Sequence, residues 1–102
     1  MTIFGILRSY GFQAGDSRSA RWGKTSNDTT KVWYGSGSLV WGTVAEIALV
    51  GDDLYEVKYH KWHYDCNGEC IFDESTTAVL HGALVLEFVF TRMGYLCRRY
   101  GG

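Results

Sequence analysis

Residues 39–59 read LVWGTVAEIALVGDDLYEVKY, two largely apolar segments on either side of Gly51-Asp52-Asp53. In the first segment alternate positions are apolar or small, and in the second tyrosine and valine alternate with charged residues. A period of two is typical of strands that bury one face. The stretch therefore predicts a β-hairpin with strands near 39–50 and 54–65.

The register of this hairpin follows from which side chains must share a face. A three-residue loop at 51–53 closes on Val50 opposite Leu54 and keeps the apolar positions together, whereas a two-residue loop would turn one strand over. The predicted pairs are Leu49 with Tyr55, Ile47 with Val57 and Glu46 with Lys58. A helical face can also be drawn through 40–48, but Gly42 and the β-branched content favour the strand.

A second hairpin is predicted at Cys66-Asn67-Gly68, with Gly68 in the left-handed conformation. It has three expected cross-strand pairs, which are Tyr64 with Cys70, Trp62 with Phe72 and Lys61 with Asp73. The apolar phase changes between Tyr59 and Trp62, which predicts a β-bulge near 60–61. Such a bulge bends a middle strand, so that Ile47, Val57, Trp62 and Phe72 would share the interior of a small barrel.

The whole chain, 1–102, is expected to form one all-β domain, with room for a short helix. The predicted architecture is a small antiparallel SH3-like barrel with strands near 2–8, 31–34, 39–50, 54–65, 69–74 and 83–91. The strand at 83–91 is apolar on both sides and is expected to be central or covered on both faces. A long polar loop at 9–30 and a short basic tail at 92–102 complete the chain.

The hairpin at 39–59 resembles that of Tudor-type SH3-like barrels, in which an apolar strand leads through an acidic-glycine turn into Tyr55-x-Val57-x-Tyr59. The resemblance implies binding of peptides or nucleic acid through aromatic side chains at one barrel end. The candidates are Trp33, Tyr34, Trp41, Tyr59 and Trp62. The register points Trp41 and Tyr59 into the core, which leaves Trp33, Tyr34 and Trp22 as expected surface anchors.

The two termini are similar to those of ubiquitin-like modifiers and sulfur carriers. The chain opens with Met1-Thr2-Ile3-Phe4 and closes with Arg98-Arg99-Tyr100-Gly101-Gly102. The resemblance implies a modifier that is activated through its terminal Gly-Gly. A β-grasp fold needs a helix after its first hairpin, however, and 16–31 shows no apolar periodicity.

The charge is unevenly distributed. The net charge is −1, yet residues 32–91 carry −7, and the two ends carry +3 each. Cations flank an aromatic ring in the loop Arg18, Arg21, Trp22 and Lys24. Such a loop can bind single-stranded nucleic acid through phosphate contacts and base stacking, although the chain has no overall basic excess.

Zinc-ligand residue types occur at His60, His63, Cys66 and Cys70. The predicted hairpin separates these side chains, so no metal and no other cofactor is expected. No phosphate-binding glycine motif or nucleophile elbow is present. Three cysteines without a recognisable secretory leader or membrane span predict a cytoplasmic protein with free thiols.

The sequence thus favours a non-catalytic binding module whose partner is a protein. Its size and character suit an accessory or inhibitor protein of the kind that phages and mobile elements carry. Single-stranded nucleic acid is the alternative partner, and a Gly-Gly modifier is the alternative role. An exposed strand such as 31–34 would also allow a homodimer through edge-to-edge pairing.

Overall fold

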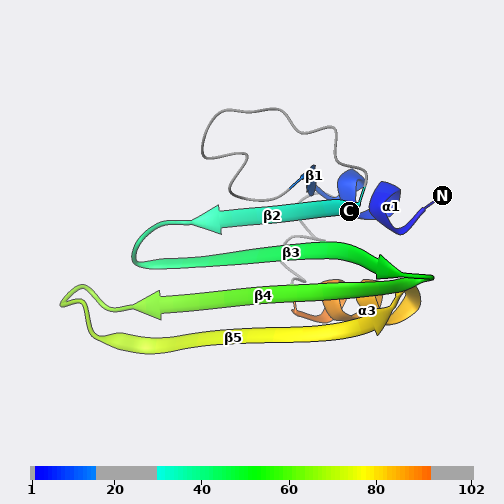
Figure 1. Ribbon diagram of the computed structural model, residues 1–102. Coiled ribbons are helices and arrows are strands. Elements are labelled where there is room, and N and C mark those ends of the chain that lie inside the picture. The colour runs from blue at the N-terminus through cyan, green and yellow to red at the C-terminus, as the bar shows by residue number, and fades with distance from the viewer. Residues whose placement is uncertain (1, 16–29, 93–102) are drawn as a thin grey trace.

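The computed structural model describes residues 2–15 and 30–92. These residues form a five-stranded antiparallel sheet in the order β1-β2-β3-β4-β5, accompanied by two helices (Figure 1). The elements are α1 (Ile3–Ser9), β1 (Gln13–Ala14), β2 (Lys31–Gly37), β3 (Trp41–Gly51), β4 (Leu54–Tyr64), β5 (Cys70–His81) and α3 (Gly82–Arg92). The all-β class is confirmed. No helix in this part of the chain is long and apolar enough to cross a membrane.

The core lies on one face of the sheet, where both helices pack. The three central strands each contribute two buried side chains at alternate positions, as a period of two requires. The buried residues of the sheet are Val32, Tyr34, Ala45, Ile47, Val57 and Tyr59. They meet Leu7 of α1 and Val85 and Val89 of α3, all fully buried. Neither α1 nor α3 lies on the opposite face of the sheet (Figure 1).

The register predicted for the first hairpin is confirmed. Its three expected pairs, Leu49 with Tyr55, Ile47 with Val57 and Glu46 with Lys58, are all present. The turn differs in detail, because Gly51 rather than Val50 faces Leu54 and Val50 is the extra residue of a bulge. Asp53 adopts a positive φ of 52°, a conformation that aspartate tolerates better than most residues.

The tip of the second hairpin is also as predicted. Tyr64 faces Cys70, and Gly68 has φ of +81°. Asp65 and Glu69 close the turn despite their like charges. One oxygen of the Asp65 carboxylate accepts the backbone N–H groups of Asn67 and Glu69, both at 2.9 Å, and so stabilises the turn.

The predicted bulge at 60–61 is wrong, and the remaining pairs of this hairpin change with it. β4 pairs without interruption through that point with β3, and the irregularity lies at Ile71 of β5. The observed pairs are Trp62 with Asp73, His63 with Phe72 and Lys61 with Glu74.

A shared interior for Trp62 and Phe72 is therefore wrong as well, because these two side chains lie on opposite faces of the sheet. Without a bulge at 60–61 the local cause of the expected barrel is missing. In the described residues β1 and β5 form the two edges of the sheet, and closure into a barrel is not among the observed pairings.

The strand predicted near 2–8 is helix α1. Thr2 is its N-cap, and the Thr2 hydroxyl accepts the N–H of Gly5 at 3.0 Å. Ile3 and Leu7, one helical turn apart, face the core. Seven residues are too few for periodicity to separate a helix from a strand, so the N-cap was the informative signal.

The strand predicted near 83–91 is helix α3. Its alternating apolar residues suggested a strand covered on both faces, but only Val85 and Val89 are fully buried, at helical spacing. Leu84 and Phe90 face outward and are exposed. Gly82 begins the helix where space is short, since a Cβ there would lie 2.7 Å from an Asp53 carboxylate oxygen.

Two other predicted boundaries also move. The strand expected near 69–74 continues as β5 to His81, through a run rich in β-branched residues. The expected loop at 9–30 begins with ordered structure, because Phe12 is buried and β1 pairs with β2. The rest of that loop, and the tail beyond Arg92, lie outside the described residues.

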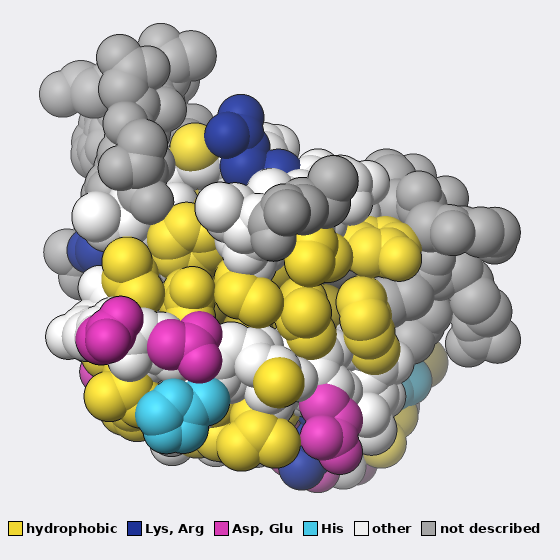
Figure 2. Space-filling view, turned by 90° about the vertical axis from the view of Figure 1, so that its right-hand side faces the viewer, with side chains coloured by type: hydrophobic (Ala, Val, Ile, Leu, Met, Phe, Trp, Pro, Cys, Tyr) yellow, Lys and Arg dark blue, Asp and Glu magenta, His cyan; other side chains and the backbone are white. Residues whose placement is uncertain are grey.

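The helices cover only one end of the sheet (Figure 1). Strands rise about 3.3 Å per residue, so the eleven residues of β4 span roughly 36 Å, whereas the eleven residues of α3 span about 16 Å. The covered end still presents hydrophobic side chains at its surface, beside acidic side chains and a histidine (Figure 2). We call the other end, with the β2–β3 and β4–β5 turns, the free end.

We expect Val57→Ala to lower the free energy of unfolding by about 2–3 kcal/mol, because two buried methyl groups are lost and a cavity remains. Val79→Ala is the matched control, since Val57 is 1 % exposed and Val79 is 56 % exposed. Its expected cost is below about 1 kcal/mol. Urea denaturation measures both, and equal losses would contradict the one-sided core.

Candidate functional site

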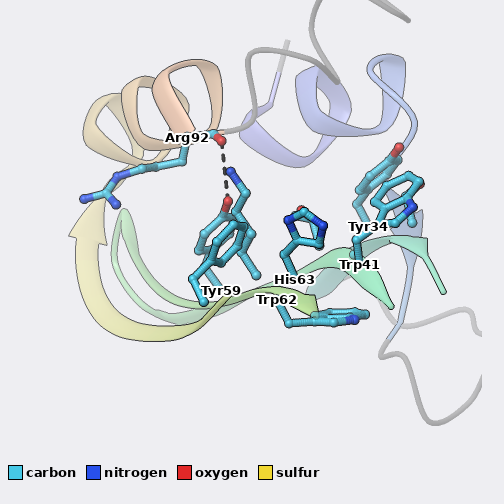
Figure 3. A pocket seen from close by; sticks show the side chains of 11 residues that line it. Tyr34, Trp41, Tyr59, Trp62, His63 and Arg92 are labelled. Atoms are coloured by element: carbon cyan, nitrogen blue, oxygen red, sulfur yellow. Dashed lines mark hydrogen bonds between the residues drawn. The ribbon is translucent and has the colours of Figure 1, made fainter. Parts of the chain in front are cut away.

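A cavity of about 400 Å³ opens on the core face of the sheet, at the boundary where the helix cover stops (Figure 3). All four long strands and the C-terminal end of α3 contribute to its lining. The aromatic lining residues are Tyr34, Trp41, Tyr59 and Phe72 on the core face, with Trp62, whose ring lies on the opposite face of the sheet, and the basic ones are Lys61, His63 and Arg92 (Figure 3). Ser36, Gly42 and Thr43 complete the described lining.

The inner wall is the last layer of the core. Tyr34 and Tyr59 are 8 % and 5 % exposed, and their rings pack on Phe12 and Phe88 with centroids 5.8 and 5.6 Å away. The Tyr59 hydroxyl donates a 3.5 Å hydrogen bond to the backbone carbonyl of Arg92 (Figure 3). Burial raises the pKa of Tyr59, so this hydroxyl remains a donor at neutral pH.

Trp41 forms the outer rim. It stands on the core face as the register predicted, but it is 55 % exposed, so its assignment to the core is wrong. The physical reason is that neither helix reaches the free end. Figure 3 shows Trp41 and Tyr34 on one side of the pocket, Tyr59 on the other and His63 between them.

Lys61 is the cation of the described lining. Arg92 contributes its backbone carbonyl, while its guanidinium lies over the Phe88 ring at 5.5 Å and points away from the cavity (Figure 3). Glu74 faces Lys61 across the hairpin on the same side of the sheet, and its charge helps to raise the pKa of Tyr59. The Lys61 ammonium lies 5.4 Å from the centre of the Phe72 ring, and His63 packs edge-on against the same ring at 5.7 Å. Apolar walls with a basic rim suit an apolar group that has a negative charge beside it.

The sequence identified some of these residues and misplaced others. Tyr34 lines the cavity but is buried, so its prediction as a free surface anchor is wrong. Trp33 is half-buried on the opposite face, where its ring covers Gly35. The predicted loop Arg18, Arg21, Trp22 and Lys24 lies outside the described residues.

Sequence reasoning missed Lys61, Phe72 and Arg92. A signal for Lys61 and His63 was available, because the period of two that runs through Val57 and Tyr59 continues to them if no bulge intervenes. Arg92 could not be placed, since it reaches the cavity only because the segment before it is a helix.

The four candidate metal ligands are dispersed. His60 and His63 lie on opposite faces of β4, Cys66 is in the turn, and Cys70 faces Tyr64 across the hairpin. In residues 2–15 and 30–92 no three His, Cys, Asp or Glu side chains are placed to hold a metal ion.

A polar network lies on the face of the sheet opposite α1 and α3. Asp73 accepts hydrogen bonds from the Tyr64 hydroxyl at 2.6 Å and from His60 Nε2 at 2.7 Å. These two bonds, with that of Tyr64 the stronger, lower the pKa of Asp73. Beside them the Trp62 ring covers Gly42, and its indole N–H donates to the carbonyl of Ser38 at 2.9 Å.

We expect Gly42→Ala to disturb this side of the site. Its Cβ would lie 2.3 Å from the Trp62 ring and 2.9 Å from a backbone oxygen of Ser36, so the indole must move. A loss of about 1–3 kcal/mol in unfolding free energy is expected for such overpacking. Gly51→Ala is the control, because its nearest contact is 3.4 Å. Urea denaturation and the Trp62 indole N–H resonance report both effects, and an unmoved resonance would contradict the contact.

We expect Tyr64→Phe to raise the pKa of Asp73, because the stronger of its two hydrogen bonds is lost. In the native chain the folded-state pKa of Asp73 lies below its unfolded value. The resulting stability is therefore present above the unfolded pKa and is lost as the pH falls through the folded pKa. NMR titration of the Asp73 carboxyl carbon measures the change, with Tyr55→Phe as control. An unchanged pKa in Tyr64→Phe would contradict the hydrogen bond.

Comparison with protein-family models, with curated proteins and with solved structures found no match to this chain.

Proposed function

We propose that this chain is a non-catalytic binding module that takes one apolar side chain of a protein partner into the cavity, with an acidic group of the partner at the rim. The observation that carries the proposal is the lining itself. Aromatic walls from Tyr34, Tyr59 and Phe72 meet a rim at which the Lys61 ammonium lies beside the Phe72 ring. A volume of about 400 Å³ falls at the small end of ligand pockets.

The lining supports binding rather than covalent catalysis. A nucleophilic mechanism needs a hydroxyl or thiol held by a base, with the base oriented in turn by a third group. His63 is the lining residue best suited as a base, yet its ring packs on Phe72, and no hydrogen bond joins it to a hydroxyl or carboxylate of the described residues. The cavity would therefore recognise a ligand by its shape and its charge.

The surroundings of the cavity favour a protein partner. Leu39, at 95 % exposed, and Trp41 extend the apolar surface outward from the rim onto the β2–β3 turn. Exposed apolar surface beside a pocket marks an interaction site, and Trp, Tyr and Arg dominate the binding energy of such sites.

The other predicted roles rest on residues outside the described part. These are the Arg18–Lys24 loop for single-stranded nucleic acid and Gly101-Gly102 for a modifier. Within the described part, the hairpins follow one another without an intervening helix, and the helices lie before β1 and after β5. The accessory or inhibitor role and the cytoplasmic location stay predictions.

The test uses a capped pentapeptide, Glu-Glu-Trp-Glu-Glu, as the probe. We expect it to bind in the millimolar range, roughly 4 kcal/mol, because a single anchor supplies the energy. Binding should shift the Trp41 indole resonance of the protein in two-dimensional NMR. Trp41→Ala and Lys61→Glu should each weaken it about tenfold, equivalent to about 1.4 kcal/mol.

Lys58→Glu is the matched control. It makes the same charge change on the same strand, but on the opposite face, and should leave the affinity unchanged. Equal affinity for Lys-Lys-Trp-Lys-Lys would overturn the charge preference. Binding of oligo(dT) that is lost in Trp22→Ala, with no binding of the acidic peptide, would support the nucleic-acid alternative instead.

A further inference from the structure

We propose that β5 pairs edge to edge with β5 of a second copy of this chain, so that two molecules share one continuous antiparallel sheet. The inference concerns a surface separate from the cavity and goes beyond the proposed function. It rests on two features of β5, its unprotected edge and its complementarity to itself.

From Ser75 to Leu80 the edge of β5 lacks the usual devices that block strand addition, while its first half carries a bulge at Ile71 and the charged residues Asp73 and Glu74. In the described residues β5 pairs only with β4, so its other side presents unpaired backbone groups. Protected edges carry charged side chains (above all lysine), proline, bulges or very short strands. β5 is twelve residues long, contains no Lys, Arg or Pro, and has its irregularity only at Ile71 near its start. β1, at the opposite edge, is two residues long.

The charges of β5 suit antiparallel pairing with itself. Its acidic residues, Asp73 and Glu74, both lie in the first half, and its second half is neutral apart from His81. In an antiparallel pair related by a two-fold axis, the first half of one copy faces the second half of the other. Acids then face neutral residues. A parallel pair in register would stack carboxylate on carboxylate instead.

The faces of the sheet restrict the register to pairings of even-numbered with even-numbered residues. Thr76 and Ala78 are paired with Tyr59 and Val57 of β4, which are buried in the core. The even-numbered residues of β5 therefore lie on the core face. Opposed residues of an antiparallel pair share a face, so even residues must meet even residues. Placing Thr76 on the axis satisfies this condition. The pairs across the axis are then Phe72 with Leu80, Asp73 with Val79, Glu74 with Ala78 and Ser75 with Thr77.

This arrangement replaces the dimer that the sequence suggested through 31–34. Those residues lie inside the sheet, where β2 pairs with β3 along its length and with β1 at Val32 and Trp33. The outer edge of β2 is therefore occupied by β1 at Val32 and Trp33. In the described chain the outer edge of β5 is uncovered along Phe72–His81.

The first test is the molar mass of the full chain by size exclusion with light scattering over a wide concentration range. A concentration-dependent dimer is expected. Ser75→Asp with Thr77→Asp places carboxylates opposite each other across the axis and should give a monomer. Ser75→Asn with Thr77→Asn has nearly the same shape without the charge and should remain dimeric. Circular dichroism confirms that both variants are folded.

The second test fixes the register. Thr76→Cys, in a chain with Cys66, Cys70 and Cys97 changed to serine, should form an intermolecular disulfide. Directly opposed residues in an antiparallel pair lie about 4.5–5.5 Å apart, within reach of a disulfide. Val79→Cys in the same background faces Asp73 of the other copy and should not cross-link. A monomer at all concentrations, a dimer that survives the aspartate pair, or cross-linking at Val79→Cys alone would overturn the proposal.

Discussion

The difference in rise between a strand and a helix governs this structure. A strand such as β4 is about 36 Å long, whereas helix α3, which packs on it, is about 16 Å long. The apolar face of the sheet is therefore longer than the helices that cover it. Where α1 and α3 lie, the face becomes a core around Ile47 and Val57. Where they stop, the same face continues in contact with solvent. The position of the cavity follows from this single mismatch.

The boundary between the two regions selects the residues found there. Tyr34 and Tyr59 each bury a ring in the core, while the Tyr59 hydroxyl still reaches a polar partner at the end of α3. Further along the strands, on the same face, come Lys61 and then Trp41 and His63, whose side chains cannot be covered by a helix of this length. The cavity is apolar at its inner end and carries Lys61 at its rim, because the strands continue beyond the point where α1 and α3 end.

The sequence was sufficient where the constraint was local. The pairs around Ile47 and Val57 follow from matching two alternating segments, and Gly68 from the chemistry of its turn. It was insufficient where two periods fitted equally well, because Leu84 to Phe90 alternates like a strand while Val85 and Val89 are spaced like a helix. The side on which Trp41 lies was predictable, but its exposure was not, since exposure depends on how far another element extends.

The free end of the sheet also has consequences for local stability. A residue such as Ala45 lies beneath a second layer, whereas Thr43, two positions away on the same strand and the same face, lines an open cavity. Amide hydrogen exchange should therefore grade along each strand, slowest beneath the helices and faster towards the turns. A ligand bound in the cavity would cover the part of the sheet that the helices leave uncovered. Amide exchange in that part of the strands should then slow down.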